Sequence, residues 1–201
     1  TRLSKFDRLP DGRPHVPDDL INRLQKITTE EAWGVLRKNG YNLQFEAGWL
    51  QTHPEKVLVG RCVTAMMLPH RPDLHDLVQE TGDADGRIGG QNSWVIDTLI
   101  EGDVLVVDMF GKVKNGTFIG DNLGTSIDTK TKRGAIFECG IRDYAGVSQL
   151  ENSTFFYRGA DPTAISDVTL AGINMPIRIG ETTVLPGDIV LGTKTGVIFI
   201  P

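Results

Sequence analysis

The sequence is poor in cysteine, and its two cysteines do not form a recognisable motif. Cys62 and Cys139 are far apart in the 201-residue chain, so there is no C-x-x-C pair. This pattern is typical neither of a disulfide-stabilised scaffold nor of a zinc knuckle. Each cysteine stands among strand-forming residues, where we expect it to be buried as a small apolar group. Such cysteine usage fits a reducing compartment, and we expect a cytoplasmic protein.

The sequence also lacks a long hydrophobic run and an excess of positive charge. No segment approaches the roughly 18 apolar residues that a membrane-spanning helix needs, and the N-terminal residues contain no apolar core of a signal peptide. The formal net charge is −5. A chain without a basic field does not attract a phosphate backbone or an anionic membrane surface. We therefore expect a soluble protein with neither nucleic acid nor membrane as a partner.

What the sequence does contain is ordinary globular composition with abundant glycine. Hydrophobic residues make up 39% of the chain, and 23 residues are glycine. No flexible linker divides the sequence, so we predict one α/β domain over residues 1–201. Residues 1–17 carry three prolines and few apolar side chains. They predict an extended arm that lies on the body of the protein or on a neighbouring subunit.

Helical periodicity is confined to a few segments, mainly in the first half of the chain. Apolar residues recur at helix spacing over 18–27, and Thr28 with Glu31 forms a capping box that begins a second helix, which ends at Gly40. Weaker helical patterns cover 73–80 and 94–100. Strands are predicted over the apolar runs 56–67, 102–110, 134–140 and 176–180, and over a C-terminal hairpin with its turn at 194–196.

Two glycine-acid turns resemble each other. Glu101-Gly102-Asp103 and Pro186-Gly187-Asp188 each lead into an apolar strand. We interpret this similarity as one kind of turn used twice and not as an internal repeat.

Two further glycine-bounded segments carry residues suited to chemistry. Gly120-Asp121-Asn122-Leu123-Gly124 is predicted to be a loop whose backbone amides can bind a carboxylate and whose Asp121 can orient or deprotonate a water. Arg142-Asp143 follows the strand predicted over 134–140. The arginine can bind a carboxylate or an enolate oxygen, and Asp143 is a hard oxygen ligand for Mg²⁺ or Mn²⁺. Ordinary turns and a surface ion pair are the structural alternative.

The order and spacing of these motifs resemble a known family. Asp121 is separated by 20 residues from Arg142-Asp143, and the motifs GDVLVVD, GDNLG, GIRD and PGDIVLGTKTGVIFIP follow one another over roughly half of the chain. This arrangement is similar to the RraA-like family. That family comprises class II pyruvate aldolases related to 4-hydroxy-4-methyl-2-oxoglutarate aldolase, together with a regulator of ribonuclease E.

The resemblance implies a role for each residue. The segment from Gly120 through Asn122 to Leu123 would bind the carboxylate of a 2-oxo acid substrate through backbone amides. Asp143 would ligate the divalent metal, Mg²⁺ or Mn²⁺. Arg142 would contact the 2-oxo oxygen and stabilise an enolate, and Asp121 would hold the water that acts as acid or base. The aldolases of the family carry a further acid three residues after the metal ligand, where this chain has Gly146.

The resemblance also implies a fold, an assembly and a reaction. We expect a swivelling β/β/α-type core with an N-terminal helical arm, assembled as a homotrimer or homohexamer with sites at subunit boundaries. The implied reaction is retro-aldol cleavage or decarboxylation of a 2-oxo acid through a pyruvate enolate. Two alternatives stay open, namely a non-catalytic RraA-like binding protein and an enzyme acting on a sugar-acid metabolite.

Overall fold

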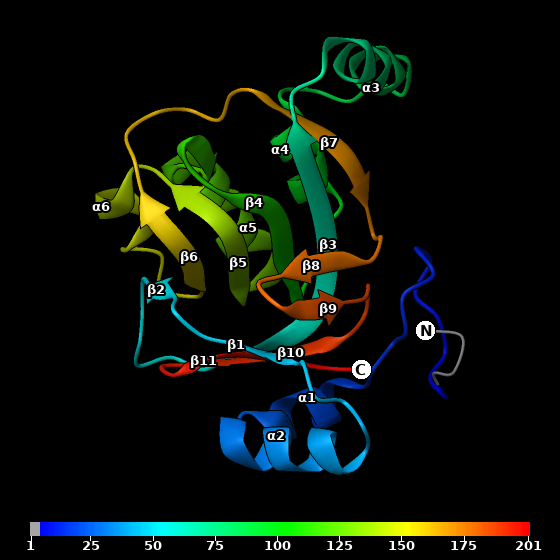
Figure 1. Cartoon of the computed structure of the whole chain (residues 1–201), viewed down its shortest axis with the longest axis vertical. Helices are drawn as coiled ribbons and strands as arrows, with labels where there is room; N and C mark the ends of the chain where they lie inside the picture. The colour runs from blue at the N-terminus through cyan, green and yellow to red at the C-terminus, as the bar shows by residue number, and fades with distance from the viewer. Residues whose placement is uncertain (1–4) are drawn as a thin grey trace.

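The computed structural model describes residues 5–201 and has a mixed α/β fold built on one large sheet (Figure 1). Residues 1–4 of the predicted arm lie outside the described residues. The helices are α1 (Asp18–Leu24), α2 (Thr29–Lys38), α3 (Pro72–Ala84), α4 (Gln91–Asp97), α5 (Asp121–Thr131) and α6 (Tyr144–Val147). The strands are β1 (Phe45–Glu46), β2 (Leu50–Gln51), β3 (Leu58–Pro69), β4 (Asp103–Ile119), β5 (Gly134–Ile141), β6 (Thr154–Ala160), β7 (Val168–Ile173), β8 (Ile177–Ile179), β9 (Thr182–Val184), β10 (Ile189–Thr193) and β11 (Gly196–Ile200).

The centre of the large sheet is parallel and its margins are antiparallel. Within the described residues the strand order is β1-β11-β10-β3-β4-β5-β6-β2, with β7 paired to β3, while β8 and β9 form a separate two-stranded sheet. Strands β3, β4, β5 and β6 are parallel neighbours. Parallel strands require crossover connections, which here contain α3 and α4, then α5, then α6. The carboxyl ends of β4, β5 and β6 therefore meet at one edge of the sheet.

The central strands are buried on both faces. In β4, Leu105 and Val107 belong to the core that contains α4 and α5, whereas Val104 and Val106 belong to the core that contains β8 and β9. Alternate side chains of a strand point to opposite faces, so each strand contributes to both cores. Parallel strands covered on both faces read as continuous hydrophobic runs, which is how these segments appear in the sequence.

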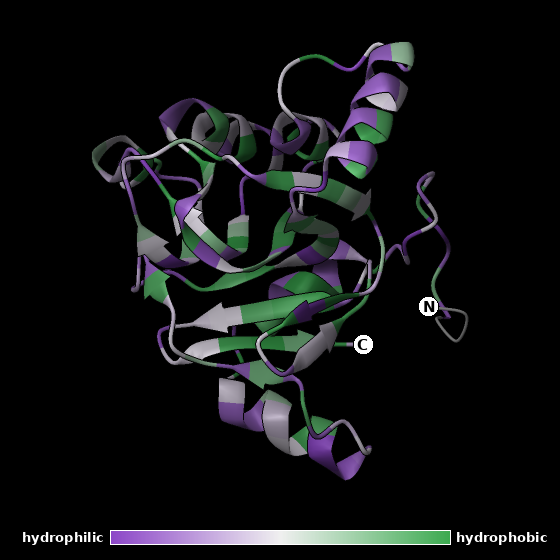
Figure 2. Ribbon diagram, turned by 45° about the horizontal axis from the view of Figure 1, so that its top comes forward, coloured by the Kyte–Doolittle hydropathy of each residue, from purple (hydrophilic) through white to green (hydrophobic). Residues whose placement is uncertain are grey.

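A third, smaller core joins the N-terminal helices to the end of the chain. Ile21 of α1 and Leu36 of α2 pack against Leu191 of β10 and Ile198 of β11. Figure 2 shows green, hydrophobic segments along the inner strands and purple, hydrophilic stretches on the outer helices. The N-terminal helices are thus attached to the C-terminal hairpin and not to the carboxyl edge of β4–β6 (Figure 1).

Several predicted elements are confirmed. Helix α2 begins with the reciprocal hydrogen bonds of the capping box between Thr28 and Glu31. The chain ends in the predicted hairpin, with β10 and β11 paired in antiparallel register. Cys62 and Cys139 are buried, and burial raises the pKa of both thiols. Among residues 5–201, no helix combines the length and the apolar composition needed to cross a bilayer.

Other predictions are wrong or incomplete. The strand predicted over 102–110 is too short, because β4 continues to Ile119 through irregular residues such as Phe110 and Asn115, which have positive φ. Its pairing with β5 shifts register after Asp108, so the simple alternation of a regular strand is lost there. Strands β1, β2, β6, β7 and β9 and helices α5 and α6 are absent from the predicted elements.

The N-terminal arm is attached to the body by a buried arginine. The Arg13 guanidinium is 2% exposed and donates to both carboxylate oxygens of Asp103, over 2.8 Å to Oδ1 and 3.1 Å to Oδ2. Its Nε also donates to Asp11 over 2.6 Å. A bidentate arginine–carboxylate pair is a strong, geometrically specific contact. The described part of the arm therefore lies on the body, one of the two places expected for it.

The two glycine-acid turns prove to be the same structure. In each, a backbone amide donates to the aspartate three residues later, from Ile100 to Asp103 over 3.1 Å and from Leu185 to Asp188 over 2.8 Å. The glycine before each aspartate has a φ near the left-handed region, 87° at Gly102 and 86° in the second turn. The shared turn chemistry predicted from the sequence is confirmed.

The two turns differ in how the buried carboxylate is neutralised. Asp103 has Arg13, whereas Asp188, which is 4% exposed, forms no ion pair with an arginine or lysine of residues 5–201. Burial raises the pKa of Asp188 to about 6, against the lowering effects of the Leu185 amide and of the positive charge at the N-terminus of the chain. A buried carboxylate without a counter-ion is costly to keep ionised.

We predict that Arg13→Met destabilises the protein by about 3–5 kcal/mol, because it leaves the Asp103 carboxylate buried without its counter-ion. The matched control is Arg71→Met, which removes a pair whose side chains are 74% and 65% exposed, with an expected loss below about 1 kcal/mol. Urea unfolding measures both free energies. Equal losses in the two variants would contradict the anchoring role of Arg13.

We also predict a specific pH dependence from Asp188. Its pKa is about 6 in the folded state and about 3.9 in an unfolded chain, so between these values the folded protein binds the additional proton. The free energy of unfolding should therefore fall by roughly 2 kcal/mol as the pH rises from 4 to 7. Asp188→Asn keeps an acceptor for the Leu185 amide and should remove this fall. Parallel unfolding–pH profiles for the two proteins would refute the prediction.

Candidate functional site

The predicted site lies where β4 and β5 end side by side. The last register pair between them is Ile119 with Ile141, and the amide of Arg142 donates to the Ile119 carbonyl over 3.0 Å. The chain therefore leaves both strands at the same edge, with Gly120 following β4 and Arg142 following β5. Loops and helix starts at this edge are where α/β folds place functional groups.

The structure brings Gly120 into direct contact with Arg142 and Asp143. A methyl group placed on Gly120 would lie 3.1 Å from Arg142 Nε and would collide with Asp143 Oδ2. Gly120 has φ −116° and ψ −162°, a conformation open to any residue. Glycine is thus required here for space and not for backbone conformation.

Arg142 and Asp143 form an ion pair at the surface. The distance between Arg142 Nη1 and Asp143 Oδ2 is 3.3 Å, and the two side chains are 41% and 40% exposed. Asp143 has φ 54° and ψ 40°, the left-handed conformation, which aspartate tolerates better than most residues. A half-exposed ion pair adds little to stability. The left-handed backbone at Asp143 also begins α6, because the Asp143 carbonyl accepts from the Gly146 amide over 2.9 Å and from the Val147 amide over 3.0 Å.

The prediction that Gly120–Leu123 is a loop is wrong, because helix α5 begins at Asp121, directly after Gly120. The Gly124 amide donates to the Gly120 carbonyl over 2.9 Å, which closes the first helical turn. The Asp121 side chain accepts from the Asn122 amide over 2.8 Å. A helix N-terminus directs amides and a partial positive charge outward, and carboxylate binding by this segment stays a prediction.

The remaining site residues occupy distinct positions on this first turn. Asp121 and Asn122 are exposed, whereas Leu123 is half-buried and packs against the core beneath α4 and α5. Leu123 therefore anchors the turn, and any contact it makes to a ligand is through its backbone. All six predicted residues lie at one edge, on the segments that follow β4 and β5.

Gly146 is a neighbour of the predicted site whose packing only the structure reveals. It lies in the short helix α6, and a methyl group placed on it would approach Asp121 Cβ to 2.9 Å. The absence of a side chain at 146 therefore leaves room for Asp121. The sequence marks this position only as the glycine at the place of an acid in related aldolases.

Tyr144 is a second neighbour that residue spacing did not single out. It directly follows Asp143, is 46% exposed, and its ring centroid lies 6.3 Å from that of Tyr157 on β6. Burial is the main cause that raises the pKa of Tyr157 to about 12, and the Tyr144 hydroxyl contributes. Tyr157 is therefore neutral at physiological pH and can act only through its hydroxyl hydrogen bond.

The residues of this edge fit a magnesium-type ion and do not fit zinc. Among residues 5–201, no group of three or more histidine, cysteine, aspartate or glutamate side chains is arranged to hold a metal. Zinc needs three or four such ligands. Mg²⁺ keeps several waters and is held by one or two carboxylates, and the half-exposed Asp143 offers one.

The chain is similar in sequence to a known protein family and to a protein of another organism. The model of a family described as "RraA-like: Aldolase/RraA" matches residues 27–199. A protein of Halalkalibacterium halodurans named "Putative 4-hydroxy-4-methyl-2-oxoglutarate aldolase" is 31% identical over 115 residues, which are 56% of this chain and 54% of that protein. The match thus spans about half the length of that relative.

Among the solved structures that share the fold are two RraA proteins. Streptomyces coelicolor RraAS2, an unusual member of the RNase ES inhibitor RraA protein family, superposes with a TM-score of 0.75 at 22% identity, covering 94% of this chain and 86% of that one. The RNA-processing inhibitor RraA from Thermus thermophilus gives a TM-score of 0.63 at 18% identity, covering 88% and 93%. At these identities the likeness extends to the fold alone.

We predict that Gly120→Ala destabilises the protein by about 1–3 kcal/mol, because the new methyl group must displace Asp143 and Arg142. The matched control is Gly34→Ala, in the middle of α2, where nothing lies within 4 Å of the new methyl group. That control should gain about 0.5–1 kcal/mol from helix propensity. Urea unfolding measures both, and a stabilised Gly120→Ala protein would contradict the contact.

Proposed function

The chain belongs to the RraA-like family, and from this premise we propose that it is a divalent-metal-dependent lyase acting on a 2-oxo acid. The reaction is retro-aldol cleavage or decarboxylation through a pyruvate enolate. The observation that carries the proposal is the contact of Gly120, at the start of α5, with Arg142 and Asp143 after β5. This contact joins an anion-binding helix start, a guanidinium and a hard carboxylate in one place.

The helix start is suited to the substrate carboxylate. Gly120, as the residue before α5, has no side chain that could cap the helix. The Asn122 amide already donates to the Asp121 carboxylate over 2.8 Å, so a substrate carboxylate would accept from the other amides at the start of α5, those of Asp121 and Leu123. The substrate would thereby be oriented with its 2-oxo group towards the residues that follow β5.

Arg142 is suited to the 2-oxo oxygen. When the bond to the leaving fragment breaks, its electron pair moves to the 2-oxo oxygen and forms the enolate. A guanidinium that is already in place stabilises this developing charge without reorganising. The ion pair with Asp143 holds Arg142 at the edge before substrate arrives.

Asp143 would hold the metal, and Asp121 would handle protons. A bound Mg²⁺ or Mn²⁺ would supply Lewis acidity towards the 2-oxo acid. The Asp121 carboxylate lies at the surface and keeps one oxygen on the Asn122 amide. It can orient a water that removes the proton of the substrate hydroxyl in cleavage, and that later returns a proton to the enolate carbon.

The open character of this edge supports a further element of the proposal. Arg142 and Asp143 are each about two-fifths exposed in the single chain. A site that stabilises an enolate needs exclusion of water. We propose that a neighbouring copy in a homotrimer or homohexamer covers the site.

The proposal predicts metal-dependent pyruvate release from 4-hydroxy-4-methyl-2-oxoglutarate or oxaloacetate. Asp143→Ala should lower kcat at least about 100-fold, because the metal loses its protein ligand. Arg142→Lys should lower kcat by about 10²–10³-fold, because a point charge replaces the planar fork, while Mn²⁺ affinity stays nearly unchanged. Release is measured by coupled lactate dehydrogenase, and Mn²⁺ binding by calorimetry.

The control variant is Asp73→Ala, an exposed acid at the start of α3 that should keep full activity. Reactions without enzyme and with a chelator correct for spontaneous decarboxylation of oxaloacetate. Full activity of Asp143→Ala would refute the site. Absence of both pyruvate release and Mn²⁺ binding would instead favour a non-catalytic binding protein.

A further inference from the structure

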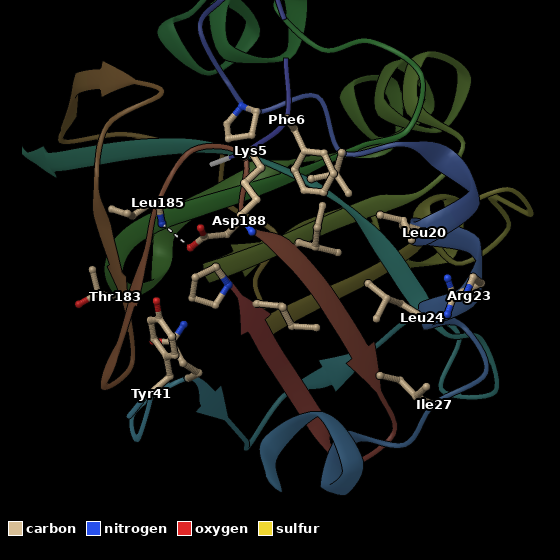
Figure 3. A pocket seen from close by; sticks show the side chains of 17 residues that line it. Lys5, Phe6, Leu20, Arg23, Leu24, Ile27, Tyr41, Thr183, Leu185 and Asp188 are labelled. Atoms are coloured by element: carbon tan, nitrogen blue, oxygen red, sulfur yellow. Dashed lines mark hydrogen bonds between the residues drawn. The ribbon is translucent and has the colours of Figure 1, made fainter. Parts of the chain in front are cut away.

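A large apolar cavity lies away from the candidate site, beneath the N-terminal arm. Its volume is about 850 Å³, and one wall is formed by Leu20 and Leu24 of α1 with Ile27. The lining also includes the start of β10, the end of β11 and residues of the arm, and Thr183 and Leu185 lie across from Leu24 (Figure 3). None of the six predicted site residues lines it. Cavities of this size and character are typical of small-molecule sites.

One acid, Asp188, lines this apolar cavity. Its side chain is among the sticks that surround the cavity in Figure 3, where the dashed line marks its bond to the Leu185 amide. That bond uses Oδ2 and is 2.8 Å long. Within residues 5–201, no further hydrogen bond and no ion pair to the Asp188 carboxylate is formed, although the residue is 4% exposed. Oδ1 is thus left for another donor.

The equivalent turn shows what satisfies such a carboxylate. Asp103 occupies the same position in its turn and accepts the same amide hydrogen bond, from Ile100. In addition, the Arg13 guanidinium donates to both of its oxygens. The chain therefore neutralises the Asp103 carboxylate with its own arginine, whereas the Asp188 carboxylate faces a cavity. A buried carboxylate without such a partner carries a large desolvation cost.

Two basic residues also line the cavity, but neither is a counter-ion of Asp188 in the way that Arg13 is of Asp103. Lys5 and Arg23 contribute to the lining, and neither forms an ion pair with Asp188. Both residues are exposed, so solvent and salt screen their charges. The Asp188 carboxylate is buried, where an electrostatic interaction is much less screened.

We infer that this cavity is a binding site for an organic cation, an ammonium or guanidinium group on an apolar body. The cationic group would donate to Asp188 as Arg13 does to Asp103, and the apolar body would lie against Leu20, Leu24 and Ile27. An alcohol of the same shape could form a hydrogen bond but would not neutralise the charge. A carboxylic acid would be repelled. The site is independent of the proposed lyase reaction.

The test uses the whole chain and three probes of one shape, namely 4-phenylbutylamine, 4-phenylbutan-1-ol and 4-phenylbutanoate. Binding is followed at neutral pH by calorimetry and by amide chemical shifts. The amine should bind at least about tenfold more tightly than the alcohol, because a hydrogen bond to a charged group is stronger than a neutral one. The acid should not bind measurably.

Three variants locate the site. Asp188→Asn keeps an acceptor for Leu185 and should weaken amine binding at least about tenfold. Leu24→Trp should block the cavity, whereas Leu77→Trp, at a 60% exposed position of α3, should leave amine binding unchanged. Asp143→Asn should likewise leave it unchanged, which separates this site from the proposed metal site.

Two results would overturn the inference. Equal binding of the amine and the alcohol, or an Asp188→Asn protein that binds the amine normally, would show that the carboxylate does not select a cation. Absence of amine binding together with self-association that Leu24→Trp abolishes would assign the cavity to a second copy of the chain. Light scattering at several protein concentrations measures that association.

Discussion

The parallel pairing of β4 with β5 is the constraint on which the candidate site depends. Because the pairing continues to Ile119 and Ile141, the residues that follow the two strands must leave the sheet as neighbours. An antiparallel pair would have sent Gly120 and Arg142 to opposite ends of the sheet. The backbone bond from Arg142 to Ile119 extends this alignment by one residue beyond the strands. Backbone hydrogen bonds between β4 and β5 are thus the reason why Gly120 and Arg142 lie close together.

Space is the second constraint at this edge. Gly120 touches the Asp143 carboxylate and the Arg142 guanidinium, and Gly146 touches Asp121. Neither glycine has a positive φ, so each is required for close approach and not for a turn. The two glycines let both aspartates lie against the backbone of the opposite segment. In the proposed lyase, the same closeness would hold Asp121 and Asp143 on either side of one small substrate.

Two buried carboxylates, away from the candidate site, lie beside the start of β3. The turns at Asp103 and Asp188 place one carboxylate on each side of β3, and both turns pair with the start of that strand. Arg13 neutralises the first and at the same time ties the arm to the body. The second faces a cavity that the arm helps to enclose. The arm is therefore both a structural strap, through Arg13, and a wall of the proposed cation site.

The sequence by itself determined the features that depend on neighbouring residues. The capping box at Thr28, the C-terminal hairpin, the burial of both cysteines and the shared turn chemistry follow from local pattern and are confirmed. The order of motifs was also sufficient to identify the RraA-like family. Local pattern did not distinguish a loop from a helix at Asp121, because that turn has glycine on both sides and its apolar contacts come from distant segments.

Only the tertiary structure decided which residues that are distant in the sequence come into contact. It brought Gly146 against Asp121, inserted Arg13 beside Asp103, and left Asp188 facing a cavity. These contacts join residues tens of positions apart, and no periodicity or spacing in the sequence encodes such distances. The physical reason is that burial and charge neutralisation are properties of the packed chain. Two turns with similar local sequence therefore acquired different electrostatic environments.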